Sequence, residues 1–416
     1  MRIVKLTPRI EKWLLARRAQ RDGAAQSVAS GIVADVRKHG DSALFAWTKK
    51  LDHLDLKREG IWIPHREIQS ARKRVSSDFL NAIKRAAKNV RTIAEKQLPR
   101  PWSIETEPGV TISQRVSPIE SIGCYIPGGR FSLVSTLIMT VMPAKVAGVS
   151  RIIAVCPKPN PELLAAAGFL GITEIARIGG AQAIAALAYG TKSVPRVDKI
   201  FGPGNKYVTA AKQLVSSDCA IDLPAGPTEA VVFAVRGNPR WIAADLLAQT
   251  EHAQDAASFF VTTSRELAQE VQREIKWQLA ELPVGMAHAS TKTAGAILVA
   301  DSPHQAVGFI NRFAPEHLSI PENAEKYFHR ICSAGTVFLG PWAAQPLGDY
   351  ATGSNHVLPT GAWARKRGGL SAADFVKCIS VQTISRSGCL RLADTVETLA
   401  ESEGLMAHRN AVRVRR

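Results

Sequence analysis

One short motif in the middle of the chain carries two side chains that can bind a metal ion. The motif is Leu247–His252, and the helical pattern before it places Gln249 and His252 three residues apart on one face of a predicted helix. Carboxylates and imidazoles recur far along the chain, in Ala314–Leu318, Gly348–His356 and Met406–His408. Polar side chains gathered from such distant segments indicate one convergent site.

Two of these segments also carry groups for acid–base chemistry. Glu316 and His317 are adjacent, so a strand would point them to opposite faces, whereas an irregular boundary could present both to one pocket. Asp349 is predicted to lie in a glycine-rich loop after a strand, either as a ligand-binding carboxylate or as part of an Asx turn. As a further metal ligand, spacing does not distinguish His356 from His408.

Composition limits the class of protein. With 416 residues, 46% of them hydrophobic and 21% charged, the chain is globular and long enough for two or more domains. Its six cysteines form no CxxC pair, which favours reduced thiols over disulfides or a cysteine zinc site. No apolar run approaches the roughly 18 to 20 residues that span a membrane. We therefore expect a soluble, cytoplasmic protein with no membrane partner.

The net charge of +17 raises the question of nucleic-acid binding. Much of the excess positive charge lies in the first hundred residues, for example between Arg72 and Arg91. Apolar residues follow a helical stripe there, so the basic residues form the solvent-facing side of a helix. The chain has no zinc-finger spacing, aromatic-basic platform or recognition-helix pattern. We therefore expect no nucleic-acid partner, and a surface that at most attracts anionic ligands.

Short β-branched segments alternate with alanine-rich helical segments from about residue 121 to 235, and a second alternating unit follows. Single helices between strands predict right-handed crossovers and parallel sheets covered on both faces. The fold is therefore predicted to be α/β, with two doubly wound, incomplete Rossmann-like domains. The predicted strands are 151–156, 175–178, 197–201, 229–233, 258–262, 296–299 and 336–339; the predicted helices are 161–170, 182–189, 205–215, 239–252 and 265–282, the last capped by Ser264.

Several predicted strands of the first unit end in glycine, at Pro127–Gly129, Gly179–Gly180 and Gly202–Gly204. Ligands of open parallel sheets sit at the carboxyl ends of strands, where glycine lets the backbone approach and helix N-termini bind phosphate. A dinucleotide could bind there. Any one of these glycines alone is better explained by a tight turn or a helix cap, but three together favour ligand binding. The Gly-x-Gly-x-x-Gly fingerprint with its later acidic ribose ligand is absent.

The predicted organisation has four parts. Residues 1–19 form an N-terminal helical extension, and residues 20–123 together with 230–365 form the domain that carries most metal-binding and acid–base residues. Residues 124–229 form the dinucleotide-binding domain. Residues 366–416 form a small C-terminal helical tail with a basic end.

The motifs, taken in order, resemble the histidinol dehydrogenase family from roughly residue 20 to 412. That family consists of zinc-dependent enzymes of histidine biosynthesis. The residues that carry the resemblance are Tyr125–Gly129, Gly179–Ile184, Phe201–Asn205, Pro224–Glu229, Gln249–His252, Pro315–His317, Gly348–Tyr350 and Asn355–Pro359.

The resemblance implies a set of site residues and an assembly. Gln249, His252, Asp349 and His408 would hold one zinc ion per subunit, and Thr228, His317 and Glu403 would join them in holding substrate. Tyr125, Gln182 and Asn205 would line the NAD site. The family also implies a homodimer in which the C-terminal tail crosses to the partner, so that Glu403 and His408 complete the other subunit's site.

The reaction implied is oxidation of L-histidinol to L-histidine through an aldehyde, with two hydride transfers to two NAD molecules. His317 would be the general base, and Glu316 would activate the water that hydrates the aldehyde. Thr228 departs from the serine common in the family; it keeps the hydroxyl and adds a methyl group. Relatives with the same zinc site oxidise other polar alcohols, such as a sulfonated propanediol. A zinc hydrolase is the alternative class, but the chain lacks a His-Glu-x-x-His helix.

Overall fold

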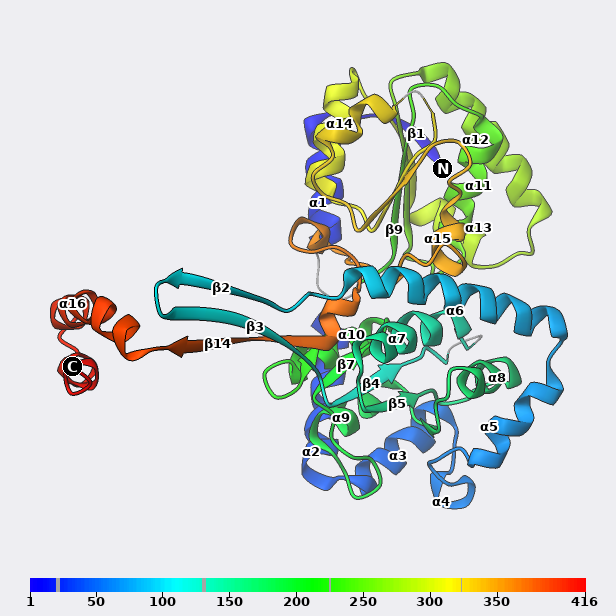
Figure 1. The fold of residues 1–416 in the computed structure, drawn as a ribbon. Coiled ribbons are helices and arrows are strands. Elements are labelled where there is room, and N and C mark those ends of the chain that lie inside the picture. Colours follow the sequence, from blue (N-terminus) through cyan, green and yellow to red (C-terminus); the bar gives the residue numbers. More distant parts are fainter. Residues whose placement is uncertain (20–22, 129–131, 224–225, 323) are drawn as a thin grey trace.

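The computed structural model describes residues 1–19, 23–128, 132–223, 226–322 and 324–416. It is an α/β protein with two parallel sheets, as predicted, and an arm that projects from the two lobes (Figure 1). The predicted elements of both alternating units are present within a few residues of their expected limits. Gly129, Pro224 and Ala225, which belong to two of the motifs, lie outside the described residues.

The first sheet has six parallel strands, which are, in spatial order, β1 (Arg2–Lys5), β11 (Gly295–Val299), β10 (Ala257–Thr262), β9 (Glu229–Phe233), β12 (His317–Ile320) and β13 (Thr336–Leu339). Helices α1 (Pro8–Ala19) and α14 (Pro303–Phe313) cover one face, and α11 (Pro239–Thr250) and α12 (Arg265–Glu281) cover the other. Strand β9 is buried along its whole length because both faces are covered. The remaining elements of this lobe are α13 (Met286–Thr293), α15 (Gln345–Tyr350) and the short helix η2 (Glu325–Arg330).

The N-terminal extension is helical at α1, as expected, but it begins with a strand. Strand β1 pairs in parallel with β11, with Ile3 opposite Ile297. The first residues therefore complete one edge of the sheet.

The second sheet has five parallel strands, which are, in spatial order, β6 (Glu174–Ala176), β5 (Arg151–Val155), β4 (Ser121–Tyr125), β7 (Lys199–Phe201) and β8 (Ala220–Ile221). Its crossover helices are α7 (Val134–Ala147), α8 (Pro161–Phe169), α9 (Gly180–Tyr189) and α10 (Lys206–Val215). The chain moves outward from β4 to β6 and then returns to the other side of β4. This reversal is the switch point at which open α/β sheets bind ligands.

The helices that precede β4 pack differently from the expectation that joined residues 20–123 to the first sheet. They are α2 (Gly23–His39), α3 (Asp41–Asp52), α4 (Leu56–Glu59), α5 (His65–Ala71), the short helix η1 (Arg72–Arg74) and α6 (Ser77–Gln97). Helix α2 packs on α9 and α10, α5 on α8, and α6 on α7, so these helices cover the five-stranded sheet. Their apolar stripes fit the surface of either lobe, and the sequence alone does not choose between them. The domain limits themselves stay a prediction.

The arm is built from a third sheet, whose strands are β14 (Val376–Ile384), β3 (Val110–Pro118) and β2 (Trp102–Glu107), all antiparallel. Helices α16 (Arg386–Ser402) and α17 (Met406–Arg413) lie at its end, which confirms a helical tail, but the tail is reached through the nine-residue strand β14. The β-branched residues of β14 favour a strand, and its pairing with β3 lies more than 250 residues away in sequence.

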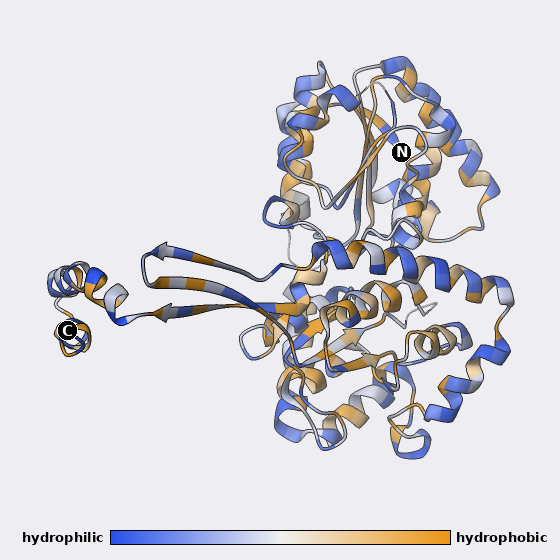
Figure 2. Cartoon of the chain, viewed as in Figure 1, coloured by the Kyte–Doolittle hydropathy of each residue, from blue (hydrophilic) through white to orange (hydrophobic). Residues whose placement is uncertain are grey.

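Apolar residues are exposed along this arm (Figure 2). They are Trp102, Ile104, Ile379, Val381, Ile384, Leu390, Leu399, Leu405, Met406 and Val414. Exposed apolar side chains gathered on one arm in this way are typical of an interaction surface. Among the described residues, the structure contains no helix long and apolar enough to cross a membrane.

A buried aromatic pair joins the five-stranded sheet to the root of the arm. The rings of Phe201, at the end of β7, and Phe375, in the short helix η4 (Ala372–Phe375), stack with centroids 4.0 Å apart and an interplanar angle of 13°. Both side chains are fully buried.

We predict that Phe375→Ala lowers the free energy of unfolding by about 3–5 kcal/mol, because it leaves a cavity between the sheet and the arm. Urea unfolding followed by circular dichroism measures the loss. Phe169→Ala, at the exposed end of α8, is the matched control and should cost less than about 1 kcal/mol. Equal losses in the two variants would contradict the role given to the stack.

Candidate active site

A chain of hydrogen bonds links the end of α11 to the start of β9 and β12. The Gln249 amide donates to the hydroxyl of Thr228, and that hydroxyl donates to the carboxylate of Glu316. The backbone N–H of Glu229 donates to the same carboxylate oxygen at 2.9 Å. Glu316 is 7% exposed, so these two donors replace water around its charge.

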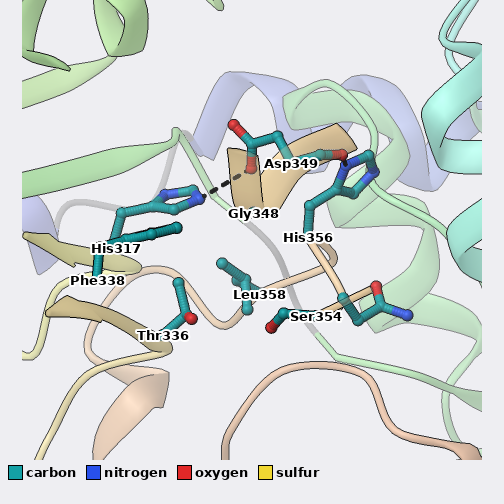
Figure 3. Close-up of a pocket in the computed structure, with 9 residues that line it drawn as sticks. His317, Thr336, Phe338, Gly348, Asp349, Ser354, His356 and Leu358 are labelled. Carbon is teal, nitrogen blue, oxygen red and sulfur yellow. Dashed lines mark hydrogen bonds and ion pairs between the residues drawn. The ribbon is translucent and has the colours of Figure 1, made fainter. Parts of the chain in front are cut away.

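His317, the first residue of β12, lies between two carboxylates. Its Nε2 is 3.3 Å from Oδ1 of Asp349, and its Nδ1 is 3.7 Å from Oε2 of Glu316. Figure 3 shows the His317 ring pointing at Asp349, with Phe338 alongside it. The irregular boundary expected before the strand is present, and it directs both Glu316 and His317 into one site.

These contacts set the protonation of the cluster. Burial raises the pKa of Glu316 above its usual range, although the neighbouring His317 opposes this shift. Burial alone would lower the pKa of His317, but Glu316 and the hydrogen bond with Asp349 outweigh it, so the pKa is raised. The hydrogen bond with His317 likewise outweighs burial at Asp349 and lowers the pKa of that carboxyl group. The imidazole is therefore arranged to take up a proton.

The position of Asp349 differs from the prediction of a glycine-rich loop. It lies in the last turn of α15, a six-residue helix with Pro346 in its first turn, where proline is well tolerated. The helix packs against α11 through Gln345, whose amide donates to Oε1 of Gln249 at 2.9 Å. Asp349 and Gln249 are thereby brought to the same place.

His252 also differs from its predicted setting. Helix α11 ends at Thr250 with Glu251 as C-cap, so His252 is exposed just beyond the helix and does not share a helical face with Gln249. Its backbone N–H still donates to the carbonyl of Gln249 at 3.4 Å, and its charge would act on Asp349 and Glu316. A backbone turn therefore keeps His252 close to the end of α11 that carries Gln249.

The two candidate histidines for a further ligand lie in very different places. His356 donates from Nδ1 to the carbonyl of Asp349 at 2.9 Å, and its Nε2 lies 3.3 Å from the hydroxyl of Thr136, so both ring nitrogens have partners. His408 is exposed on α17, at the end of the arm, and Glu403 is the exposed C-cap of α16. Within one chain, neither Glu403 nor His408 joins the site (Figure 1).

Among the described residues, no group of three or more His, Cys, Asp or Glu side chains is placed to hold a metal ion. One chain supplies three of the four predicted zinc ligands. They are the imidazole of His252, the carboxylate of Asp349 and the amide oxygen of Gln249. Imidazole, carboxylate and amide oxygen donors suit zinc, and four ligands are usual. The residues therefore fit a zinc site that lacks one ligand within a single chain.

The predicted dinucleotide residues lie at the carboxyl edge of the five-stranded sheet. The Tyr125 hydroxyl accepts a hydrogen bond from the backbone N–H of Gly180 at 3.1 Å. Gln182 is fully buried in the first turn of α9, and Asn205 caps α10 by accepting from the N–H groups of Tyr207 and Val208. The Tyr125 and Asn205 side chains therefore also bind the local backbone, whereas the Gln182 amide donates to the carboxylate of Asp52 at 3.0 Å.

Gly202 shows why this edge needs glycine. Its φ is +113°, and a Cβ atom would lie 2.1 Å from the carbonyl oxygen of Tyr125. The close approach of two backbone segments, between β4 and β7, therefore requires glycine at this position.

Several residues around the site were not found from the sequence. They are Asp245, Gln345 and Thr136, together with four residues lining the pocket beside His317, namely Thr336, Phe338, Ser354 and Leu358 (Figure 3). Only Asp245 carries a signal that could have been read, because a carboxylate is unusual among the apolar residues of a buried helix.

Asp245, on α11, binds the start of α15, whereas Asp349 lies near the end of α15. Its carboxylate accepts a hydrogen bond from the backbone N–H of Gln345, the first residue of α15. Burial nevertheless raises its pKa to about 6. The carboxyl group therefore helps to anchor the helix that carries Asp349.

The sequence profile of the family described as "Histidinol dehydrogenase" matches residues 15–416. The histidinol dehydrogenase of Methanosarcina barkeri is 44% identical over 411 residues, which cover 97% of this chain and 94% of that protein. The enzyme of Vibrio parahaemolyticus is 42% identical over 409 residues, with 97% and 94% covered. The crystal structure of histidinol dehydrogenase from Elizabethkingia anophelis superposes with a TM-score of 0.94 at 38% identity, covering 100% and 98% of the two chains.

We predict that Asp245→Asn stabilises the protein increasingly as the pH rises. The raised pKa means that the folded state prefers the protonated acid, so the wild-type protein loses stability as the pH rises through about 6. The asparagine variant cannot ionise, and its advantage should grow by about 1–2 kcal/mol between pH 4 and pH 8. Urea unfolding at both pH values measures this difference.

The exposed Asp255 provides the matched control, and Asp255→Asn should show no such growth. A constant difference between the Asp245→Asn variant and the wild type at both pH values would contradict the prediction.

Proposed function

Because the chain belongs to the histidinol dehydrogenase family, a family of oxidoreductases, we propose that it oxidises L-histidinol to L-histidine through L-histidinal. Each of the two oxidations would transfer a hydride to NAD, and together they would be the last steps of histidine biosynthesis. The observation that supports this reaction best is the position of His317 between Glu316 and Asp349. An imidazole with a raised pKa is suited to accept a proton from an alcohol.

The two oxidations need the same proton acceptor. His317 would take the hydroxyl proton of histidinol in the first oxidation and the hydroxyl proton of the aldehyde hydrate in the second. Glu316 would activate the water that hydrates the aldehyde, and its buried setting excludes other water from that reaction. Holding both steps in one site would keep the reactive aldehyde from escaping.

The hydrogen bonds of Thr228 give it a role in arranging the substrate site. Its hydroxyl is held between Gln249 and Glu316, so its position is fixed by a proposed metal ligand on one side and a proposed catalytic group on the other. The methyl group that distinguishes it from serine leaves these two hydrogen bonds in place.

We propose that Gln249, His252 and Asp349 of one subunit, with His408 of a second copy, hold a zinc ion. When bound, zinc would fix the imidazole and amine of histidinol and so hold the reacting carbon in place. Glu403 would hold substrate from the same second copy. Two observations support a homodimer with exchanged tails: Glu403 and His408 lie exposed at the end of the arm, and the arm exposes apolar side chains.

Tyr125, Gln182 and Asn205 are the proposed NAD-binding residues. They lie at the carboxyl edge of the five-stranded sheet, on the strands and helices that flank its switch point. This is the edge at which dinucleotides bind to open α/β sheets.

We predict that the zinc-loaded protein forms two NADH molecules per L-histidinol, measured by absorbance at completion. His317→Asn removes the proton acceptor and should lower kcat by about 10²- to 10⁴-fold. The exposed His329 gives the control His329→Asn, which should leave kcat unchanged. A chelator should abolish turnover in every variant.

One NADH per histidinol would overturn the two-step reaction. Turnover of another polar alcohol, with none of histidinol, would keep the dehydrogenase chemistry and overturn the substrate.

Tail exchange predicts complementation between two inactive variants. Asp349→Ala damages one half of each site and His408→Ala damages the other half. Co-expression would give heterodimers with one intact site and one doubly damaged site, and so about a quarter of wild-type activity for random pairing. Steady-state activity of the purified mixture measures the recovery.

The matched control pairs Asp349→Ala with Gln249→Ala, two changes within the same half of the site, and should recover no activity. Recovery in the control pair, or none in the test pair, would count against the exchange.

A further inference from the structure

The five-stranded sheet lacks the carboxylate that dinucleotide-binding units of this topology use. With β4 as the first strand, the spatial order is third, second, first, fourth and fifth, as in the first part of a Rossmann fold. In that fold an acidic residue after the second strand binds the adenosine ribose. Here the second strand is β5, and Cys156, Pro157 and Lys158 follow it.

A carboxylate from outside this unit reaches the same edge. Asp52 is the last residue of α3, which packs against α9. Its Oδ2 accepts a hydrogen bond from Nε2 of Gln182 at 3.0 Å, and the charge of Lys158 acts on it. Asp52 is therefore placed beside the end of β5, where the sequence of the unit itself supplies no acid.

Gln182, which donates to Asp52, also carries a buried hydrogen-bond acceptor, its Oε1. Gln182 is 0% exposed, and among the described residues its Oε1 has no hydrogen-bond partner, although its Nε2 donates to Asp52. A buried acceptor without a donor is costly and points to a missing ligand group. Gly180 has φ +61°, and a Cβ atom there would lie 2.5 Å from this oxygen, so glycine keeps the space in front of it open.

Asp52 itself is incompletely compensated by the protein. Burial raises its pKa, against the opposing effects of Lys158 and Gln182. The edge therefore presents two acceptors side by side, a half-buried carboxylate and a buried amide oxygen. A vicinal diol supplies two hydroxyl donors and is the group that matches them.

We propose that Asp52 is a cofactor-binding residue that accepts hydrogen bonds from the adenosine ribose diol and thereby selects NAD over NADP. This inference rests on the proposed NAD-dependent function. A 2′-phosphate would remove one donor and bring a second negative charge against the carboxylate. Lys158 is exposed nearby and would attract that phosphate once the carboxylate is neutral.

The test compares Asp52→Asn with the wild type, using NAD and NADP at saturating L-histidinol and NADH binding followed by fluorescence without substrate. Loss of one charge-assisted hydrogen bond should raise KM for NAD and the Kd of NADH about tenfold. The ratio of kcat/KM for NAD to that for NADP should fall at least about tenfold, since the repulsion is also removed. We expect kcat with NAD and KM for histidinol to stay within about twofold, which a general folding defect would not permit.

Glu120→Gln is the matched control. Glu120 precedes β4 and is exposed at the opposite edge of the same sheet, so its loss removes an equal charge without touching the proposed site. It should leave the cofactor preference unchanged.

A second measurement starts with the wild-type protein, and that part of its result does not depend on whether a variant folds. The NAD analogue that lacks the 2′-hydroxyl of the adenosine ribose should bind the wild-type protein about tenfold more weakly than NAD, and the Asp52→Asn variant should show a smaller difference. An unchanged preference for NAD over NADP in a folded Asp52→Asn variant, or equal affinity of the wild type for NAD and the analogue, would overturn the inference alone. A wild-type protein that neither binds NADH nor reduces NAD would overturn the proposed function and this inference with it.

Discussion

The site depends on how the buried charge of Glu316 is satisfied. An unpaired carboxylate in this position would cost several kcal/mol, so the Thr228 hydroxyl and the Glu229 N–H must both reach it. The parallel pairing of β12 with β9, which places His317 opposite Ala230, brings these donors to the carboxylate. A slip of one residue would turn His317 to the other face of the sheet. The register of two strands thus fixes the geometry of the proposed catalytic residues Glu316 and His317.

A buried ion pair holds the backbone in place at the carboxyl edge of the five-stranded sheet. Lys212 and Asp222 form an ion pair that is almost fully buried, and both bind the backbone of Gly202, the lysine at its carbonyl and the carboxylate at its N–H. Arg367 donates to the carbonyl of Asp222 and to Asp374 at the root of the arm. A buried ion pair is weak evidence for stability, but it can specify one loop geometry. This one ties the proposed NAD-binding edge of the sheet to the segment from which the arm departs.

The sequence predicts those features that local physics determines. Period and capping predict α8 to α12 and the strands β6, β7, β9 and β10 between them, though not the two-residue strand β8, and Ser264 caps its helix as expected. What it does not predict depends on partners far away in sequence. The apolar stripes of α2 to α6 fit either lobe, and β14 is paired with β3, which lies far away in sequence. The end of α11 at Thr250 is a different case, because it is set locally and differs from the expected end by about half a turn. Residue type and spacing indicate Gln249, Glu316 and Asp349 before any resemblance does, whereas their supporting partner Gln345 belongs to no motif and is found only by packing.

The arm shows how assembly and chemistry would depend on each other. An antiparallel ribbon of three strands with exposed Trp102, Ile104 and Val381 buries too little apolar surface to be favourable alone in water. Covering it with a second copy would remove that surface from water and, under the proposed exchange, bring Glu403 and His408 to the partner's site. A single chain holds the acid–base group, Glu316 and His317, in place without help, because strand pairing positions them. Under this proposal, dissociation would leave the acid–base residues intact and remove the metal and substrate contacts of the tail.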